Sequence, residues 1–242
     1  RPARKAPSKS DEDRMQLIGM LDSPYVRRVA VALIAADIPF THRPISLFRH
    51  IDEYSRLNAL LKAPTLITDE GTVLMDSGVI LEYLAGAHPR VAALTPAEAS
   101  RRLPALRATG IALTVMEKAV QRHYERSLRP ADKRHQPWVD RIMSQLEAGL
   151  AALDAELPVA GWTGDEFGLG DISVACAYGF VGSVLSDLAE TDRYPNLVAF
   201  CGRAEALPAF RAAPAEDGVT APVVPQAGEA SRFAGQTGDS RS

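Results

Sequence analysis

A change in the apolar pattern near residues 87–96 constrains the fold more than any other feature of the sequence. Before it, short apolar runs typical of strands alternate with segments of helical periodicity. After it, every periodic segment repeats its apolar residues every three or four positions, as an amphipathic helix does. The sequence therefore predicts an α/β domain over residues 15–88, followed by an all-helical domain over residues 96–213.

The front half has the element order βαβ, then α, then a ββ hairpin, then α. Its first helix is well marked, because Ser23 can cap it, Pro24 suits its first turn and apolar residues follow at helical spacing. Asp69-Glu70-Gly71 is a turn signal between two short apolar runs. Strands are expected at residues 15–20, 40–45, 64–68 and 72–75, and the other helices over residues 51–61 and from Ser77, which is expected to cap its own helix.

The back half is expected to be a helical bundle. Apolar residues from Trp138 to Leu157 mark a long amphipathic helix, residues 172–186 form an uncharged buried helix, and Pro195 starts a last one.

Both ends of the chain differ from the rest. Residues 1–14 and 214–242 are rich in Pro, Gly, Ser, Ala and charge without sustained periodicity, so both are predicted to be disordered. Met15, where the patterned sequence begins, is a candidate for the true start of the protein.

Composition excludes several classes of function. With 27 basic and 30 acidic residues and a net charge of −3, the 242-residue chain is not expected to bind nucleic acid or an anionic membrane. Its longest uncharged apolar stretch, residues 172–186, is too short to span a bilayer. Cys176 and Cys201 form no CxxC or Cys/His cluster, so no disulfide framework is implied and a cytoplasmic location fits best. The histidines lack metal-ligand spacing and are expected at the surface, and no nucleotide-binding or serine-hydrolase motif occurs.

Three short motifs in the front half carry the chemistry, and the first is Asp22-Ser23-Pro24-Tyr25. It lies at a helix N-terminus, where unpaired N–H groups and the helix dipole favour negative charge. Thioredoxin-like redox proteins place a CxxC there, but Ser23 and Val26 hold those positions here, so disulfide exchange is excluded. The Ser23 hydroxyl can instead donate a hydrogen bond to a thiolate that a ligand brings, or it can be a helix cap and nothing more.

The second motif is Lys62-Ala63-Pro64, at the start of a predicted strand. A cis peptide bond before Pro64 would turn the backbone of Ala63 toward the Ser23 loop, where it could pair with a peptide ligand as an added strand. The alternative is an ordinary trans proline at a strand edge.

The third motif is Asp76-Ser77, after the last predicted strand. A helix N-terminus at Ser77 would seat a carboxylate, and Asp76 beside it could bind an ammonium group. An α-amino acid end group needs that pair of charges. The alternative is a helix cap next to a solvated acid.

Together, at these spacings and in this order, the three motifs resemble the glutathione transferase superfamily. The run from Ser23 to Val29 matches the active-site loop of bacterial, serine-type members, Ala63-Pro64 falls where the family has its cis-proline, and Asp76-Ser77 falls where it binds the γ-glutamyl end of glutathione. The resemblance covers residues 15–213. It implies a cytosolic protein with a thioredoxin-like βαβαββα domain followed by an all-helical bundle.

The resemblance also implies roles for the residues of the second and third motifs. Ala63 would pair its backbone with the cysteinyl part of glutathione, and Pro64 would fix that geometry. Ser77 would hold the γ-glutamyl carboxylate while Asp76 approaches the amino group, and Lys62 would reach the glycine carboxylate. Glutathione would be a co-substrate, and no metal is implied.

At the reacting end, the resemblance makes Ser23 the hydrogen-bond donor to the glutathione thiolate, with Tyr25 as the alternative. In the back half, Gly168 stands where the family usually has a Ser or Thr cap, which leaves only Asp171 of the capping box. Residues 122–134 are interpreted as a solvated helix end, with a second-substrate contact as the alternative, and Tyr124 as core or rim.

The implied function is that of a glutathione transferase, in which the thiolate attacks an electrophilic small molecule held between the Ser23 loop and the first helices of the back half. Conjugation, isomerisation, dehalogenation and peroxide reduction all stay open. Two other classes of protein also stay open: a binding or scaffold protein of this fold without turnover, and a glutathione-independent isomerase or lyase. A homodimer is a further implication of the resemblance.

Overall fold

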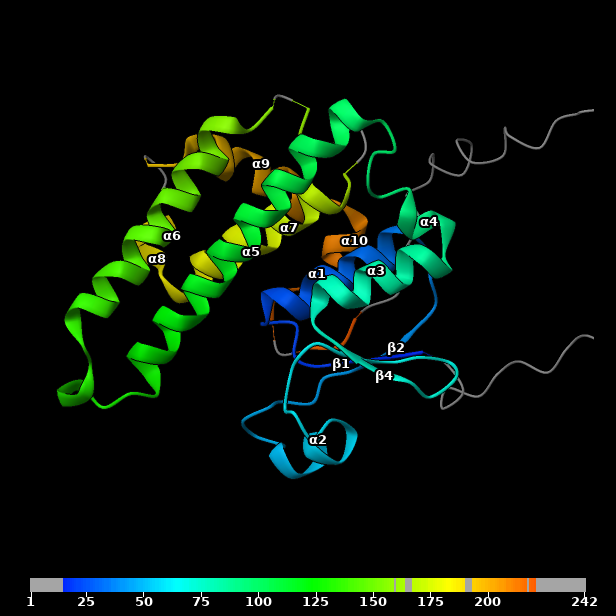
Figure 1. The fold of residues 1–242 in the computed structure, drawn as a ribbon, viewed down its shortest axis with the longest axis horizontal. Helices are drawn as coiled ribbons and strands as arrows, with labels where there is room; N and C mark the ends of the chain where they lie inside the picture. Colours follow the sequence, from blue (N-terminus) through cyan, green and yellow to red (C-terminus); the bar gives the residue numbers. More distant parts are fainter. Residues whose placement is uncertain (1–14, 159, 164–166, 190–192, 217, 221–242) are drawn as a thin grey trace, which may run out of the picture.

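The computed structural model describes residues 15–158, 160–163, 167–189, 193–216 and 218–220. Figure 1 shows a small sheet with its helices beside a bundle of longer helices. None of the described helices combines the length and the apolar character needed to cross a membrane. Most of the predicted disorder, at residues 1–14 and 221–242, lies outside the described residues.

The sheet has four short strands in the order β2-β1-β3-β4. β1 pairs in parallel with β2 and antiparallel with β3, and β3 and β4 form an antiparallel hairpin, with Leu66 opposite Leu17 on one side and Leu74 on the other. The predicted strands are all present but shorter than expected: β1 Gln16–Ile18, β2 Thr41–Arg43, β3 Thr65–Ile67 and β4 Val73–Met75.

Helices cover both faces of this sheet. α1 Pro24–Ala35 and α3 Ser77–Ala87 lie together on one face, and α2 Ile51–Leu57 lies on the other (Figure 1). α1 also packs against the bundle, so that even its two arginines are buried. The element order is βαβαββα, which confirms the predicted architecture of the front half.

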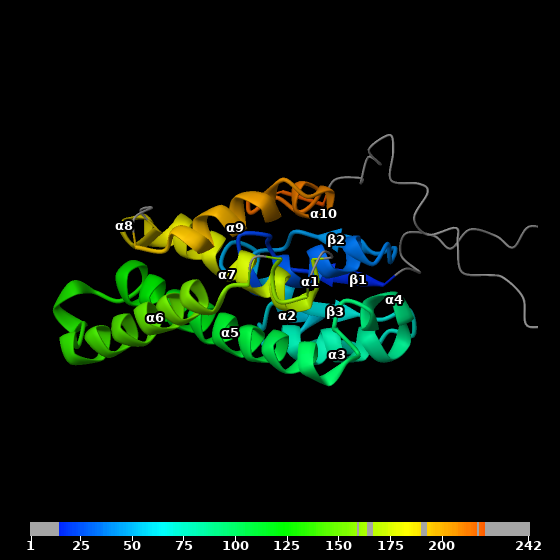
Figure 2. The same cartoon turned by 90° about the horizontal axis from the view of Figure 1, so that it is seen from above.

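The back half is helical throughout its described part. Figure 2 shows α7 between the pair α5 and α6 and the helix α9. The predicted apolar face of α6 is buried at Ile142, Leu146, Leu150 and Leu153, whereas Trp138 is 41% exposed. The elements are α4 Pro89–Ala92, α5 Ala99–Ser127, η2 Ala131–Lys133, α6 Gln136–Glu156, α7 Leu169–Val184, α8 Ser186–Ala189, α9 Pro195–Glu205 and α10 Pro208–Arg211.

Small residues bring α5 and α7 close together. The buried face of α5 is mostly alanine, and a Cβ added at Gly170 of α7 would lie 3.0 Å from the backbone oxygen of Ala105. Backbones can approach this closely only where side chains are absent or small. Asp171 then fixes the start of α7, because its carboxylate accepts hydrogen bonds from the N–H groups of Gly168, Trp162 and Thr163.

Arg27 joins the two halves of the molecule. Its guanidinium donates to both carboxylate oxygens of Glu205 at 2.6 Å and to the backbone oxygen of Ala213 at 2.8 Å, and it lies over the ring of Phe210. Because this arginine comes from α1 and its partners lie in α9, in α10 and directly after α10, the contact holds these last helices against the front half.

The expectation that the histidines lie at the surface is wrong for His42. Its ring is buried beneath the sheet edge, where Nε2 pairs with the backbone oxygen of Gly19 at 2.8 Å and Nδ1 accepts from the N–H of Thr220 at 3.2 Å. Two backbone partners satisfy a neutral imidazole completely, so burial is tolerated. Thr220 belongs to the segment predicted to be a disordered tail, and it is held here by this hydrogen bond.

Candidate functional site

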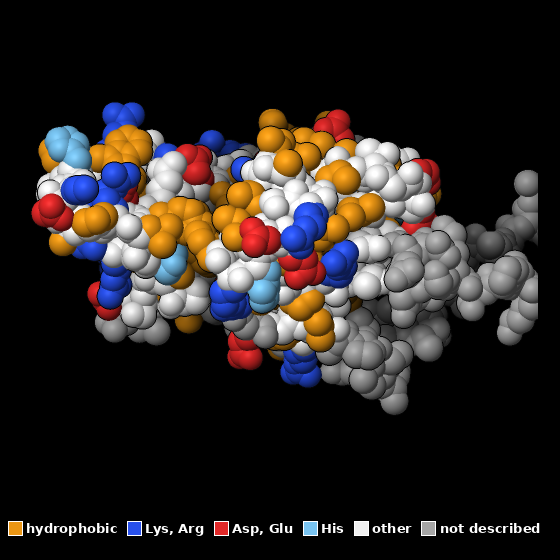
Figure 3. Space-filling view, turned by 90° about the horizontal axis from the view of Figure 1, so that it is seen from below, with side chains coloured by type: hydrophobic (Ala, Val, Ile, Leu, Met, Phe, Trp, Pro, Cys, Tyr) orange, Lys and Arg blue, Asp and Glu red, His pale blue; other side chains and the backbone are white. Residues whose placement is uncertain are grey.

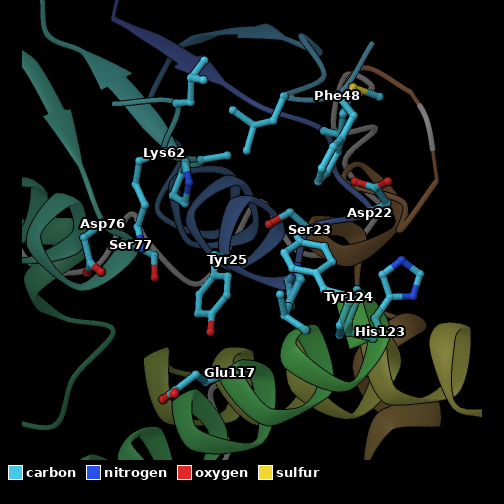
Figure 4. A pocket seen from close by; sticks show the side chains of 18 of the residues that line it. Asp22, Ser23, Tyr25, Phe48, Lys62, Asp76, Ser77, Glu117, His123 and Tyr124 are labelled. Atoms are coloured by element: carbon cyan, nitrogen blue, oxygen red, sulfur yellow. The ribbon is translucent and has the colours of Figure 1, made fainter. Parts of the chain in front are cut away.

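All three motifs predicted from the sequence line one cavity of about 730 Å³. Figure 4 shows Asp22, Ser23 and Tyr25 at the start of α1, with Lys62 and the Asp76–Ser77 corner to one side. The opposite wall comes from α5, which contributes residues that no motif predicted. On the face seen in Figure 3, apolar side chains gather near the middle with acidic and basic side chains around them.

Ser23 caps α1 as predicted. Its backbone is extended at φ −73° and ψ 122°, and its Oγ accepts from the N–H of Val26 at 3.5 Å. Because the cap uses the oxygen as an acceptor, the hydroxyl proton can be donated to a second group in the cavity. The loop before it depends on Gly19, which has φ +135°, and a Cβ there would lie 2.6 Å from Val26 Cγ2.

The peptide bond between Ala63 and Pro64 is cis, which confirms that expectation. The loop that carries it is braced from the side of α2. The Tyr54 hydroxyl donates to the backbone oxygen of Lys62 at 3.0 Å, and Thr65 Oγ1 donates to the same oxygen at 2.7 Å. This loop therefore has a fixed shape where it meets the cavity, while the Lys62 side chain stays exposed.

The prediction that Ser77 caps α3 is wrong. Asp76 is the cap: it has φ +72°, and its Oδ1 accepts from the N–H of Gly78 at 2.8 Å. Aspartate tolerates this left-handed backbone conformation better than most residues do, since its short side chain can bond locally. Ser77 is instead the first residue of the helix and is buried, with its Oγ at the cavity wall.

Arg28 lies behind Ser77, and no motif predicted a role for it. Its Nη1 donates to Ser77 Oγ at 3.0 Å, while its Nε has no hydrogen-bond partner among the described residues. Burial lowers the pKa of Arg28 to about 10, so the side chain remains a cation at neutral pH. The available signal was a second arginine in a helix that is otherwise apolar. An arginine on such a helix is buried as a charge, and a buried charge requires a compensating partner.

The wall from α5 holds Glu117, Tyr124 and His123, so of the two places expected for Tyr124, core or rim, the structure shows an exposed position at the cavity and not the core. Tyr124 meets Phe48, from the loop before α2, edge to face, with ring centroids 5.8 Å apart. Figure 4 shows the Tyr25 hydroxyl directed toward Glu117. Burial, together with the nearby carboxylates of Glu117 and Asp76, raises the pKa of Tyr25 to about 12.

Family models match both halves of the chain. Residues 17–98 match the glutathione S-transferase N-terminal domain, and residues 136–203 match the glutathione S-transferase C-terminal domain. Among solved structures, a glutathione S-transferase from Methylobacterium radiotolerans in complex with glutathione sulfonate is similar, at 30% identity and a TM-score of 0.77. That match covers 87% of this chain and all of the other.

Two curated relatives are more distant. The uncharacterized GST-like protein YibF of Escherichia coli is 26% identical over 167 residues, which is 69% of this chain and 82% of that protein. Maleylacetoacetate isomerase of Pseudomonas aeruginosa is 28% identical over 153 residues, which is 60% of this chain and 71% of that enzyme. With both domain models matched in order and a 30% identical structure covered from end to end, the chain belongs to the glutathione S-transferase superfamily.

Proposed function

We propose that this chain is a glutathione transferase that binds glutathione with its sulfur at Ser23 and presents the thiolate to an electrophilic small molecule. One observation carries the proposal. The Ser23 hydroxyl, the Ala63–Pro64 loop and the Asp76–Ser77 corner come from separate parts of the chain and line a single cavity. The relative solved with glutathione sulfonate supports it.

Activation of the thiol would come from Ser23 and the N-terminus of α1. Lowering a thiol pKa of about 8.5 by two units requires roughly 2.7 kcal/mol. A hydrogen bond to a charged group contributes about 1.5–3 kcal/mol, and the helix dipole contributes about 0.3–1 kcal/mol. Together they contribute about 1.8–4 kcal/mol, a range that includes the energy required. The thiol proton leaves to solvent, and the bound thiolate is held in position for attack.

The γ-glutamyl end of glutathione would lie at the start of α3. Because Arg28 donates to Ser77 Oγ, the Ser77 hydroxyl proton points elsewhere, and a carboxylate in the cavity can accept it. The buried cation behind Ser77 would attract the same carboxylate, and the exposed Asp76 would pair with the ammonium group. Ala63 would bond the cysteinyl backbone, with Pro64 shaping the loop, and Lys62 would meet the glycine carboxylate.

Ser23 is a better thiolate partner than Tyr25. The phenol of Tyr25 already lies near two carboxylates, Glu117 and Asp76, which raise its pKa. A thiolate placed against it would add a third negative charge to the same region. The Ser23 hydroxyl lies at the positive end of α1 instead.

Glutathione binding by calorimetry, together with conjugation of an aryl halide, tests the proposal. Ser23→Ala should bind glutathione almost as the wild type does and lose about 10- to 100-fold in kcat/KM at neutral pH, because about two pKa units of thiol activation are removed. Tyr25→Phe is the matched control and should keep most of the activity. The reverse pattern would assign the role to Tyr25, and glutathione binding without turnover of any electrophile would favour a scaffold.

Glutathione-dependent isomerisation is the second candidate, favoured by the similarity to a maleylacetoacetate isomerase. Isomerisation would return glutathione unchanged, whereas conjugation consumes it. Measuring free thiol during turnover therefore separates the two reactions.

We also propose that residues 15–88 and 96–213 are the two domains, that the protein is a homodimer and that it is cytoplasmic. The sheet with its helices and the helical bundle support the division, and light scattering of the purified protein tests the dimer.

A further inference from the structure

His42 is a buried side chain outside the cavity lining, and its ring joins two distant parts of the chain. Nε2 lies 2.8 Å from the backbone oxygen of Gly19, and Nδ1 accepts from the N–H of Thr220 at 3.2 Å. Because a carbonyl oxygen can only accept, Nε2 must carry the proton and Nδ1 must be bare. The bond from Thr220 therefore favours the same tautomer that holds Gly19.

Gly19 lies where the first two motifs of the site meet. A Cβ on it would lie 2.6 Å from Val26 Cγ2 and 3.3 Å from Ala63 Cβ, so its backbone is wedged between the start of α1 and the cis-proline loop. The chain then turns directly into Ser23, whose N–H donates to the backbone oxygen of Met20 at 3.2 Å. A shift of Gly19 would change the spacing between Ser23 and Ala63.

The sheet holds Gly19 on one side only. Its N–H donates to the backbone oxygen of Arg43 at 3.1 Å, next to the last residue pair of β1 and β2. Its own oxygen has no hydrogen-bond donor other than His42 within the described parts of the chain. The imidazole thus supplies the hold that the sheet does not give.

The segment that carries Thr220 is attached to the front half at two points. It follows α10, which packs beside α1 (Figure 1). Near its start, the buried Ala213 accepts a hydrogen bond from Arg27 Nε at 2.8 Å, and at Thr220 it reaches His42. We call residues 213–216 and 218–220 the C-terminal strap, because they link α1 to β2 across the loop that leads to Ser23.

We propose that His42 is a positioning residue for Ser23 and Ala63, and that the C-terminal strap supports the glutathione site through it. This rests on the proposed function, since the two positioned groups are those assigned to the cysteinyl part of glutathione. Without the bond from Thr220, the ring proton can move to Nδ1. Nε2 would then face the Gly19 oxygen with a lone pair, and the hold on the loop would be lost.

Two neighbouring prolines test the strap in the full chain. Thr220→Pro removes the N–H that donates to His42, since proline has none. Val219→Pro is the matched control, because Val219 is exposed and its N–H has no hydrogen-bond partner among the described residues. Hydrogen exchange without glutathione follows the amides of Gly19 and Ser23. They should exchange about threefold faster in Thr220→Pro, since one net hydrogen bond changes an equilibrium by about two- to tenfold. Val219→Pro should leave them unchanged.

Substitutions of His42 itself test the positioning role. His42→Phe removes both bonds of the ring and should speed exchange of the loop amides about tenfold. His42→Gln offers one amide donor and one amide acceptor and should restore part of the protection. Glutathione affinity, measured by calorimetry well below the Tm, should fall in the same order, while kcat at saturating glutathione changes little. A loss of stability alone would lower the Tm and leave affinity at that temperature unchanged.

The outcomes separate this proposal from the proposed function. Equal exchange in Thr220→Pro and the wild type, or equal acceleration by both prolines, would overturn the role of the strap and leave the transferase proposal standing. Faster exchange with unchanged glutathione affinity would overturn the positioning role. Faster exchange in Thr220→Pro alone, in a protein whose wild type binds no glutathione, would support the hold of the strap on the Ser23 loop and contradict the transferase proposal.

Discussion

The Ser77 hydroxyl lies between a buried arginine and the cavity, and that position gives it its proposed function. Arg28 donates to it from one side and has an unpaired Nε among the described residues, so a ligand carboxylate would offset part of the cost of burying this cation, beyond what the Asp76 carboxylate already offsets. The buried charge of Arg28, which is unfavourable in the free protein, would thus become a source of affinity in the complex.

Arg28→Met should weaken glutathione binding about tenfold without lowering the Tm of the free protein. Replacing a buried charge with an apolar side chain of similar size is often neutral or stabilising. Calorimetry and thermal unfolding measure the two effects, with kcat expected to change little. Arg28→Lys keeps the charge and should restore part of the affinity. Wild-type affinity in Arg28→Met would rule out this role.

His42 makes stability depend on pH. Burial lowers the pKa of His42 in the folded protein, so the unfolded chain, with a histidine pKa of about 6.5, binds its proton more readily. Stability should therefore be full above that value and fall as the pH drops below it. Unfolding in denaturant at several pH values should show this slope in the wild type and a smaller one in His42→Gln. Equal slopes would mean that another group is responsible.

Among the helices and strands, the spacing of apolar residues predicted the elements themselves but not the contacts between them. The apolar spacing of α6 identified its buried face correctly at Ile142 and Leu146. The capping of α3 by Asp76 could not be predicted from apolar spacing, because it depends on the backbone conformation of Asp76, which has a φ of +72°. Glu117 and Tyr124 were missed because a polar face of α5 becomes a cavity wall only when the two halves pack together.

Two glycines in neighbouring helices should respond oppositely to alanine. A Cβ at Gly110 of α5 would meet nothing within 4 Å, so Gly110→Ala should raise the free energy of unfolding by about 0.5–1 kcal/mol. A Cβ at Gly149 of α6 would lie 2.7 Å from Val115 Cγ2, a stiff and buried side chain. Gly149→Ala should therefore lower stability by about 1–3 kcal/mol in denaturant titration. Stabilisation by both changes would contradict the described packing of α5 on α6.

At the scale of the whole molecule, one apolar core runs through both halves. Residues of β1 and α1 belong to the same buried cluster as those of α5, α7 and α9, and Arg27 adds its ion pair with Glu205. Because the halves share their core, we expect them to unfold in one transition.

Glu205→Gln should lower the Tm of that single transition and not split it. The substitution leaves the buried Arg27 without its charged partner, and because Glu205 is 45% exposed, we expect a loss of roughly 1–2 kcal/mol, below the range for fully buried pairs. Calorimetry detects either outcome. Two separate transitions in the variant would show that the ion pair, and not the core, joins the halves.

The ionisation of bound glutathione tests the central claim most directly. Ultraviolet absorbance of the thiolate, titrated with pH in the enzyme–glutathione complex, gives the pKa of the bound thiol. The wild type should show it about two units below the free value of about 8.5, and Ser23→Ala should return it most of the way while glutathione stays bound. A bound thiol with the same pKa in both proteins would contradict the assignment of Ser23.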